Sequence, residues 1–133
     1  MARLNLKAYK ISNINFRNTL VNGTKLELNN SYSYNVKYAA NNICEGILKI
    51  EIKDKNGNEN FLIEMTVQGM FESDGSMERE QLHVATFKEL FPYARVFVST
   101  LTVSAGMPPI NIPPVDMDKQ EIYRIDMNPD LRK

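Results

Sequence analysis

Apolar and polar residues alternate through most of the first half of the chain, a period of two that predicts β-strands. Apolar residues take every second position over 32–38, 48–52 and 61–67, and the last run ends in Gly69 and Phe71 on the same face. Asn56-Gly57 separates the last two runs, and both residues accept the positive φ of a tight hairpin turn. We therefore predict a β-hairpin that brings the second and third of these runs together.

The run before these also alternates, but its parity changes along the way. Leu4 and Leu6 share one parity, whereas Tyr9 and Ile11 share the other. Such a switch within one strand predicts a bulge or a bend. With a turn at Asn22-Gly23, the first half predicts four antiparallel strands, packed on one face and partly wet on the other.

The second half changes to a spacing of three and four residues, which predicts a long helix. Glu78 and Glu80 suit its N-terminus, and Gly106 is a natural terminator. Pro92 lacks a backbone donor, so it either kinks this helix or marks its true start. The apolar positions of the helix are Val84, Phe87, Phe91, Ala94, Val98 and Leu101. Capping-box spacing at 118–121 predicts a short C-terminal helix.

A second apolar stripe lies on another side of the long helix. One stripe is enough to cover a sheet face, so the second needs another partner. A helix from a second copy of the chain is the economical partner, and a C-terminal segment folding back is the alternative. The residues predicted for an interface between copies are Leu90, Tyr93, Phe97 and Leu101.

Composition fits one α+β domain over residues 1–133: a four-stranded antiparallel sheet packed against one long helix and a short C-terminal helix. Hydrophobic residues make up 43% of the 133 positions, enough for a core. Sixteen basic residues balance sixteen acidic ones, so no basic field favours nucleic acid. A single cysteine and the lack of a signal-peptide-like or membrane-spanning apolar run predict a cytoplasmic protein without membrane insertion.

Catalytic and metal-binding patterns are weak. His83 is the single histidine, and with Glu80 it forms only half of a two-metal carboxylate motif. We expect it to be solvated or at the edge of the core. Cys44 has no second cysteine for a metal site or an activated pair. The serines lack a nucleophile elbow, and the glycines form no phosphate-binding loop. The sequence thus predicts no enzyme, no metal and no cofactor.

Apolar contact surface is what remains. Tyrosines alternate along 32–38 on one face, while Lys37 points to the other, which disfavours a nucleic-acid surface. Four prolines hold 108–115 extended and prevent full pairing in a sheet. These segments form either a binding groove or a completed core. The predicted peptide-binding groove residues are Tyr32, Tyr34, Val36, Tyr38, Ile110, Ile112 and Val115.

Several motifs together resemble the SecB family of protein-export chaperones. They are Leu90-Phe91-Pro92-Tyr93-Ala94-Arg95, the loop from Gly106 to Val115, Phe61-Leu62-Ile63-Glu64, Gly69-Met70-Phe71 and Asn13-Ile14-Asn15-Phe16. The resemblance implies a dimer or a tetramer built as a dimer of dimers, with the long helices between sheets. It also implies ATP-independent binding of unfolded polypeptides in hydrophobic grooves and hand-over to the SecA motor, with Leu62 and Glu64 as the translocase contact.

Some positions depart from what the resemblance implies. Asn13 and Arg17 stand where acidic residues are expected, and 130–133 reads Asp-Leu-Arg-Lys rather than an acidic tail. These departures concern the SecA contact more than the fold. A SecB-like module for another partner, such as an antitoxin, or for a small apolar ligand therefore stays open.

Overall fold

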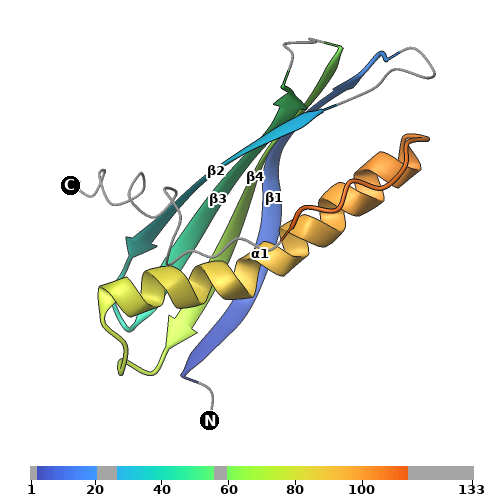
Figure 1. Cartoon of the computed structure of the whole chain (residues 1–133). Helices are drawn as coiled ribbons and strands as arrows, with labels where there is room; N and C mark the ends of the chain where they lie inside the picture. The colour runs from blue at the N-terminus through green and yellow to red at the C-terminus, as the bar shows by residue number, and fades with distance from the viewer. Residues whose placement is uncertain (1–2, 21–26, 56–59, 114–133) are drawn as a thin grey trace.

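The chain folds into one antiparallel sheet with a long helix across one of its faces (Figure 1). The computed structural model describes residues 3–20, 27–55 and 60–113. The strands are β1 (Leu4–Asn18), β2 (Leu28–Tyr38), β3 (Ile43–Asp54) and β4 (Phe61–Ser73), in the order β1-β4-β3-β2, and the helix is α1 (Arg79–Ser104). The predicted sheet and long helix are confirmed. The predicted short helix and both Asn-Gly turns lie outside the described residues.

The predicted β3–β4 hairpin is confirmed by its register and its burial. Ile50 pairs with Met65 and Ile52 pairs with Ile63, and all four side chains are buried. In β1 the register shifts between Leu6 and Ala8 and again between Ile11 and Asn13. These irregularities confirm the bulge that the parity change predicted.

The core lies between the sheet and α1, and it includes more of the helix than the sequence predicted. Phe87, Phe91, Ala94 and Val98 are buried as expected. Leu90 was assigned to a stripe facing another copy, yet its side chain is 0% exposed. It seats over Gly69, where an added Cβ would lie 2.8 Å from Leu90 Cδ1. A glycine in β4 thus opens the space that draws Leu90 inward.

Both ends of α1 are fixed by local hydrogen bonds. The Glu78 amide donates to the side chain of Gln81 at 3.0 Å, closing the first turn. The helix begins well before Pro92, which lies inside it, so Pro92 does not mark its start. At the other end, the amides of Gly106 and Met107 donate to the carbonyls of Val103 and Thr102 at 3.0 and 2.9 Å. This is a Schellman motif, and Gly106 takes the required positive φ of 85°.

Candidate functional site: a cleft between the long helix and the strap

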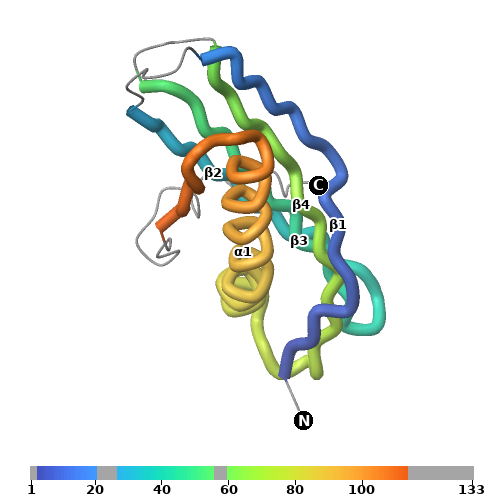
Figure 2. The backbone as a smooth tube through the Cα atoms, turned by 90° about the vertical axis from the view of Figure 1, so that its right-hand side faces the viewer, coloured from blue at the N-terminus to red at the C-terminus, as the bar shows by residue number. Residues whose placement is uncertain are grey.

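After the Schellman turn, the chain doubles back along α1 (Figure 2). We call residues 107–113 the strap. Two side chains of α1 hold its backbone: Thr102 Oγ1 accepts from the Ile110 amide at 3.0 Å, and Arg95 Nε donates to the Ile112 carbonyl at 2.7 Å. The strap prolines carry no amide hydrogen for a sheet ladder. The helix therefore supplies the partners that a neighbouring strand would otherwise provide.

The apolar side chains of the strap turn toward the protein. Ile112 is 1% exposed and belongs to the core cluster, and Ile110 and Met107 pack partly buried against it. Of the predicted groove residues, Ile112 is therefore buried and fixes the strap to the core, whereas Ile110 keeps accessible surface. Val115 lies outside the described residues.

A cleft of about 340 Å³ opens between the strap and α1. Exposed apolar surface comes from Pro92 and Val96, with buried Ile112 also in the lining, and hydrogen-bonding groups come from Arg95, Ser99, Thr100 and Asn111. Val96 is 65% exposed, an unusual fraction for a valine beside a core. The cleft can therefore take an apolar side chain and a polar group side by side.

Tyr32 of β2 connects this region to the aromatic core. Its ring meets Phe91 edge-on, with centroids 5.9 Å apart. Burial raises the pKa of the Tyr32 hydroxyl, while the hydrogen bond to Asn30 and the charge of Arg95 act in the opposite direction. Tyr32 is half-buried and retains accessible surface, as the predicted groove requires.

The rest of the predicted tyrosine strip lies deeper. Tyr34 is 0% exposed and Val36 is 8% exposed, so both belong to the core and offer a peptide almost no surface. Tyr34 is buried because Gly46, which has no side chain, leaves room for its ring, and because its hydroxyl donates a hydrogen bond to Thr86 Oγ1. Tyr38 is half-buried at the other end of β2, where Arg79 lies 4.4 Å from its ring centre. The strip is thus divided between core and edge.

The stripe predicted to meet another copy is also divided. Leu90 is interior, and Phe97 and Leu101 pack partly buried against the core. Tyr93 is 44% exposed and stacks on Tyr9 of β1 with ring centroids 4.5 Å apart. Val96 and Val103, which are 65% and 53% exposed, also lie on the exposed side of α1 but were not predicted. Their signal was the helical spacing 93, 96 and 103.

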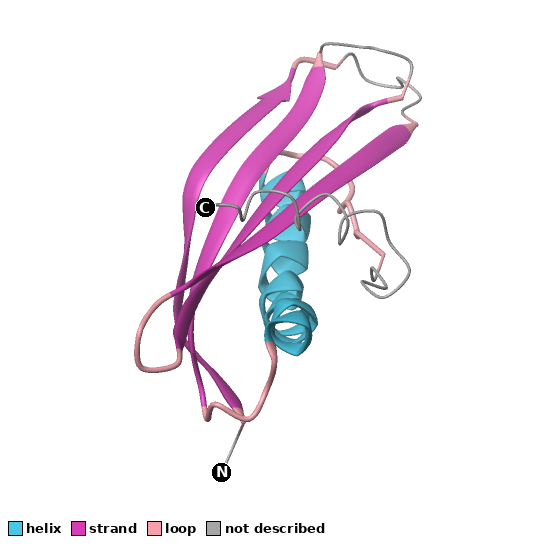
Figure 3. Cartoon of the chain, turned by 90° about the vertical axis from the view of Figure 1, so that its left-hand side faces the viewer, coloured by secondary structure: helices cyan, strands magenta, loops and turns pink. Residues whose placement is uncertain are grey.

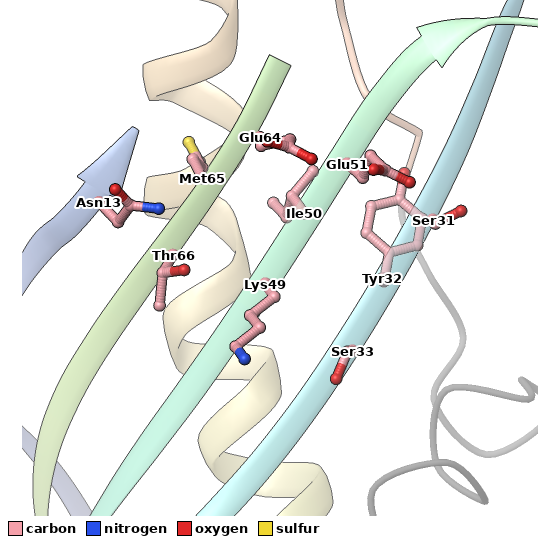
Figure 4. A pocket seen from close by; sticks show the side chains of 10 residues that line it. All are labelled: Asn13, Ser31, Tyr32, Ser33, Lys49, Ile50, Glu51, Glu64, Met65 and Thr66. Atoms are coloured by element: carbon pink, nitrogen blue, oxygen red, sulfur yellow. The ribbon is translucent and has the colours of Figure 1, made fainter. Parts of the chain in front are cut away.

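Leu62 and Glu64, the predicted translocase contact, alternate along β4 with the buried residues Phe61, Ile63 and Met65, so they lie on the sheet face opposite α1. Figure 3 shows the helix behind this sheet. A hollow of about 390 Å³ there is lined by residues of all four strands, among them Asn13, Lys49, Glu51 and Glu64 (Figure 4). Glu64 accepts a hydrogen bond from Asn15 Nδ2 at 3.1 Å and pairs across the strands with Glu51. Leu62 is half-buried on the same strand. The face is thus polar and carries charges of both signs.

The two residues considered for chemistry are packed inside. His83 is 5% exposed beside the Tyr34 ring, and burial lowers its pKa to about 4. The prediction that it is solvated is therefore wrong. Cys44 is 3% exposed, and burial raises the pKa of its thiol, which makes it unreactive. Across the described ranges, no group of three or more potential metal ligands occurs. No described helix is long and apolar enough to cross a membrane.

Comparison with known proteins agrees with this architecture. The family described as "Preprotein translocase subunit SecB" matches residues 2–128. The protein-export protein SecB of Paracoccus denitrificans is 35% identical over 98 residues, which is 66% of this chain and 55% of that protein. The SecB of Actinobacillus succinogenes is 29% identical over 100 residues, or 71% of this chain and 60% of that protein. The aligned part thus spans a little over half the length of these relatives.

A solved structure shares the fold. The SecB-like chaperone of Mycobacterium tuberculosis, in complex with a peptide from the HigA1 antitoxin, superposes with a TM-score of 0.69. It is 13% identical and covers 86% of this chain and 88% of that one. The shared fold is a four-stranded antiparallel sheet with one long helix across a face. The chain belongs to the SecB family, whose chaperones are non-enzymatic.

Proposed function

We propose that this protein is an ATP-independent holdase that binds unfolded polypeptide in the cleft between α1 and the strap. The observation that carries the proposal is the strap itself. An extended, proline-braced segment held on a helix by Arg95 and Thr102 forms a stiff wall beside exposed Val96. A preformed wall costs a bound chain less ordering entropy than a flexible loop would.

Affinity in such a site comes mainly from apolar burial. Burying client side chains gives about 25 cal/mol per Å², which requires no particular sequence. Tyr32 on β2 and Ile110 within the strap are two half-buried members of the predicted groove. Replacing a core residue such as Tyr34 by a charged residue would test folding rather than binding, because Tyr34 is fully enclosed.

The proposal is tested by light scattering from an aggregating client with the wild type and with the Pro92→Ser, Val96→Ser double variant, which removes the exposed apolar side chains that Pro92 and Val96 contribute to the cleft. The wild type should suppress aggregation without nucleotide, and the variant should suppress it less at equal concentration. Lys37→Ser is the matched control, because Lys37 is exposed and points away from the Tyr32 side of β2. Equal protection by the double variant would remove the cleft from the proposal.

Assembly into dimers or tetramers and a cytoplasmic role in protein export extend the proposal. Exposed Tyr93 and Val103 along α1 support contact between copies, because water-exposed apolar residues on one helix favour burial against a partner. Leu62 and Glu64 on the opposite sheet face would contact SecA. A pull-down with purified SecA, comparing the wild type with Glu64→Lys, tests that hand-over.

A different partner is the second proposal. The sheet face around Glu64 carries Lys49 and Asn13 in the same hollow, so its charges are mixed rather than acidic. Mixed charge weakens attraction to a basic partner. A partner such as an antitoxin segment, held in the strap cleft, would need no contact with this face. Client protection without measurable binding to SecA would favour this alternative.

A further inference from the structure

Arg95 is an isolated charge at the wall of the strap cleft. It is the sole charged residue in the sequence between Glu89 and Asp116. Within the part of the chain that the structure describes, its side chain forms no ion pair with a carboxylate. A half-buried cation in apolar surroundings has lost part of its hydration, so an incoming anion gains more there than at an open surface.

The guanidinium is also pre-oriented. Its Nε donates to the Ile112 carbonyl at 2.7 Å, which fixes the plane of the group against the strap. A guanidinium carries five N–H donors, and the described hydrogen bonds use the one on Nε. The terminal nitrogens form the fork that matches a carboxylate in two parallel hydrogen bonds.

The neighbours of Arg95 in the cleft suit a carboxylate within a peptide. Ser99, Thr100 and Asn111 are neutral hydrogen-bonding residues, and none of the described residues that line this cleft is acidic. Val96 and Pro92 supply apolar surface on the same wall. The combination fits an acidic side chain with an apolar neighbour, carried by an extended segment.

We propose that the cleft between α1 and the strap is a carboxylate-binding subsite, in which Arg95 holds a glutamate or aspartate of the bound polypeptide next to an apolar side chain. This inference rests on the proposed function and adds a preference among clients. It predicts that acidic residues flanked by apolar ones are favoured at one position of a bound segment.

The test is a double-mutant cycle between protein and peptide. The probes are labelled apolar peptides in which one glutamate, or one glutamine in the matched set, occupies each position in turn. Fluorescence anisotropy gives the dissociation constants for the wild type and for Arg95→Gln. At one or more positions, the wild type should prefer glutamate over glutamine by about tenfold, the range of a charge-assisted hydrogen bond. Arg95→Gln should abolish this preference.

The cycle separates a direct contact from loss of the strap's hydrogen bond. A displaced strap weakens both peptides alike and leaves their ratio unchanged. Lys88→Gln is the matched control, because it removes one charge from the exposed side of the same helix and should keep the preference. Equal affinity for glutamate and glutamine peptides at every position would overturn the inference. Failure of the wild type to bind any of the peptides would overturn the proposed function itself.

Discussion

The hydroxyl of Tyr34 on β2 donates a hydrogen bond to Thr86 Oγ1 on α1 at 2.6 Å, in a site closed to solvent. Thr86 in turn donates to the Leu82 carbonyl at 2.7 Å. This chain of hydrogen bonds allows a tyrosine to be buried completely, because its polar end is satisfied inside the core. It also fixes the distance between the sheet and the helix that carries the cleft.

Replacing Thr86 by valine keeps the shape but removes the acceptor. The buried Tyr34 hydroxyl then loses its hydrogen bond to Thr86, which should lower the free energy of unfolding by about 1–3 kcal/mol. Tyr34→Phe should cost less, because Thr86 can still bond to the Leu82 carbonyl. In urea titrations, Thr86→Val should lower the free energy of unfolding much less in the Tyr34→Phe background than in the wild type. Strict additivity would show that the hydrogen bond contributes no coupling energy.

Gly46 and Tyr34 form a second coupled pair. A Cβ added at Gly46 would collide first with the Tyr34 hydroxyl. Gly46→Ala should therefore destabilise the fold by about 1–3 kcal/mol through overpacking. Adding Tyr34→Phe removes the nearest atom and should recover part of that loss. A thermal or urea melt in which Tyr34→Phe worsens Gly46→Ala would contradict this packing.

Stability should depend on pH through His83. Burial lowers its pKa from 6.5 to about 4, so between these pH values the unfolded chain binds a proton at His83 and the folded chain does not. The stabilisation from keeping His83 neutral is complete above pH 6.5 and is lost as the pH falls toward 4, by up to about 3 kcal/mol. The difference in unfolding free energy between the wild type and His83→Gln should fall over this range, whereas parallel curves would contradict the assignment. Carboxylates titrate in both proteins and cancel in the difference.

Association between copies should depend on the exposed stripe of α1. Val103 is 53% exposed and does not line the strap cleft, so Val103→Asp leaves the core intact and places a charge where a partner helix would pack. We expect a lower mass by light scattering coupled to gel filtration, with an unchanged circular dichroism spectrum. Lys88→Asp, which introduces an acidic side chain elsewhere on the same helix, is the control and should leave the mass unchanged. If the wild type is already a monomer, the self-association proposal fails.

The sequence identified most of the fold because its local signals agree with the tertiary structure. Alternation around the hairpin matched the buried residues of β3 and β4, and Gly106 stopped α1 through the positive φ that its Schellman turn needs. The parity change in β1 predicted register shifts, although the pattern alone could not place both of them.

The burial of individual groove residues could not be read from the sequence. Whether Leu90 faces inward depends on Gly69, and whether Tyr34 is enclosed depends on Gly46 and Thr86. Each of these pairs joins residues far apart in the chain, and periodicity reports only which face of its own element a residue occupies. The role of Arg95 in holding the strap was missed for the same reason.

The most direct test of the central claim is photo-crosslinking from the strap. A benzophenone attached through Asn111→Cys, in a Cys44→Ser background, probes the cleft, and the same label at Lys37→Cys probes the far side of β2. The proposed function predicts crosslinks from position 111 to an unfolded client, fewer from position 37, and none to the client once it is folded. Equal labelling from both positions, or none from position 111 while aggregation is suppressed, would contradict it.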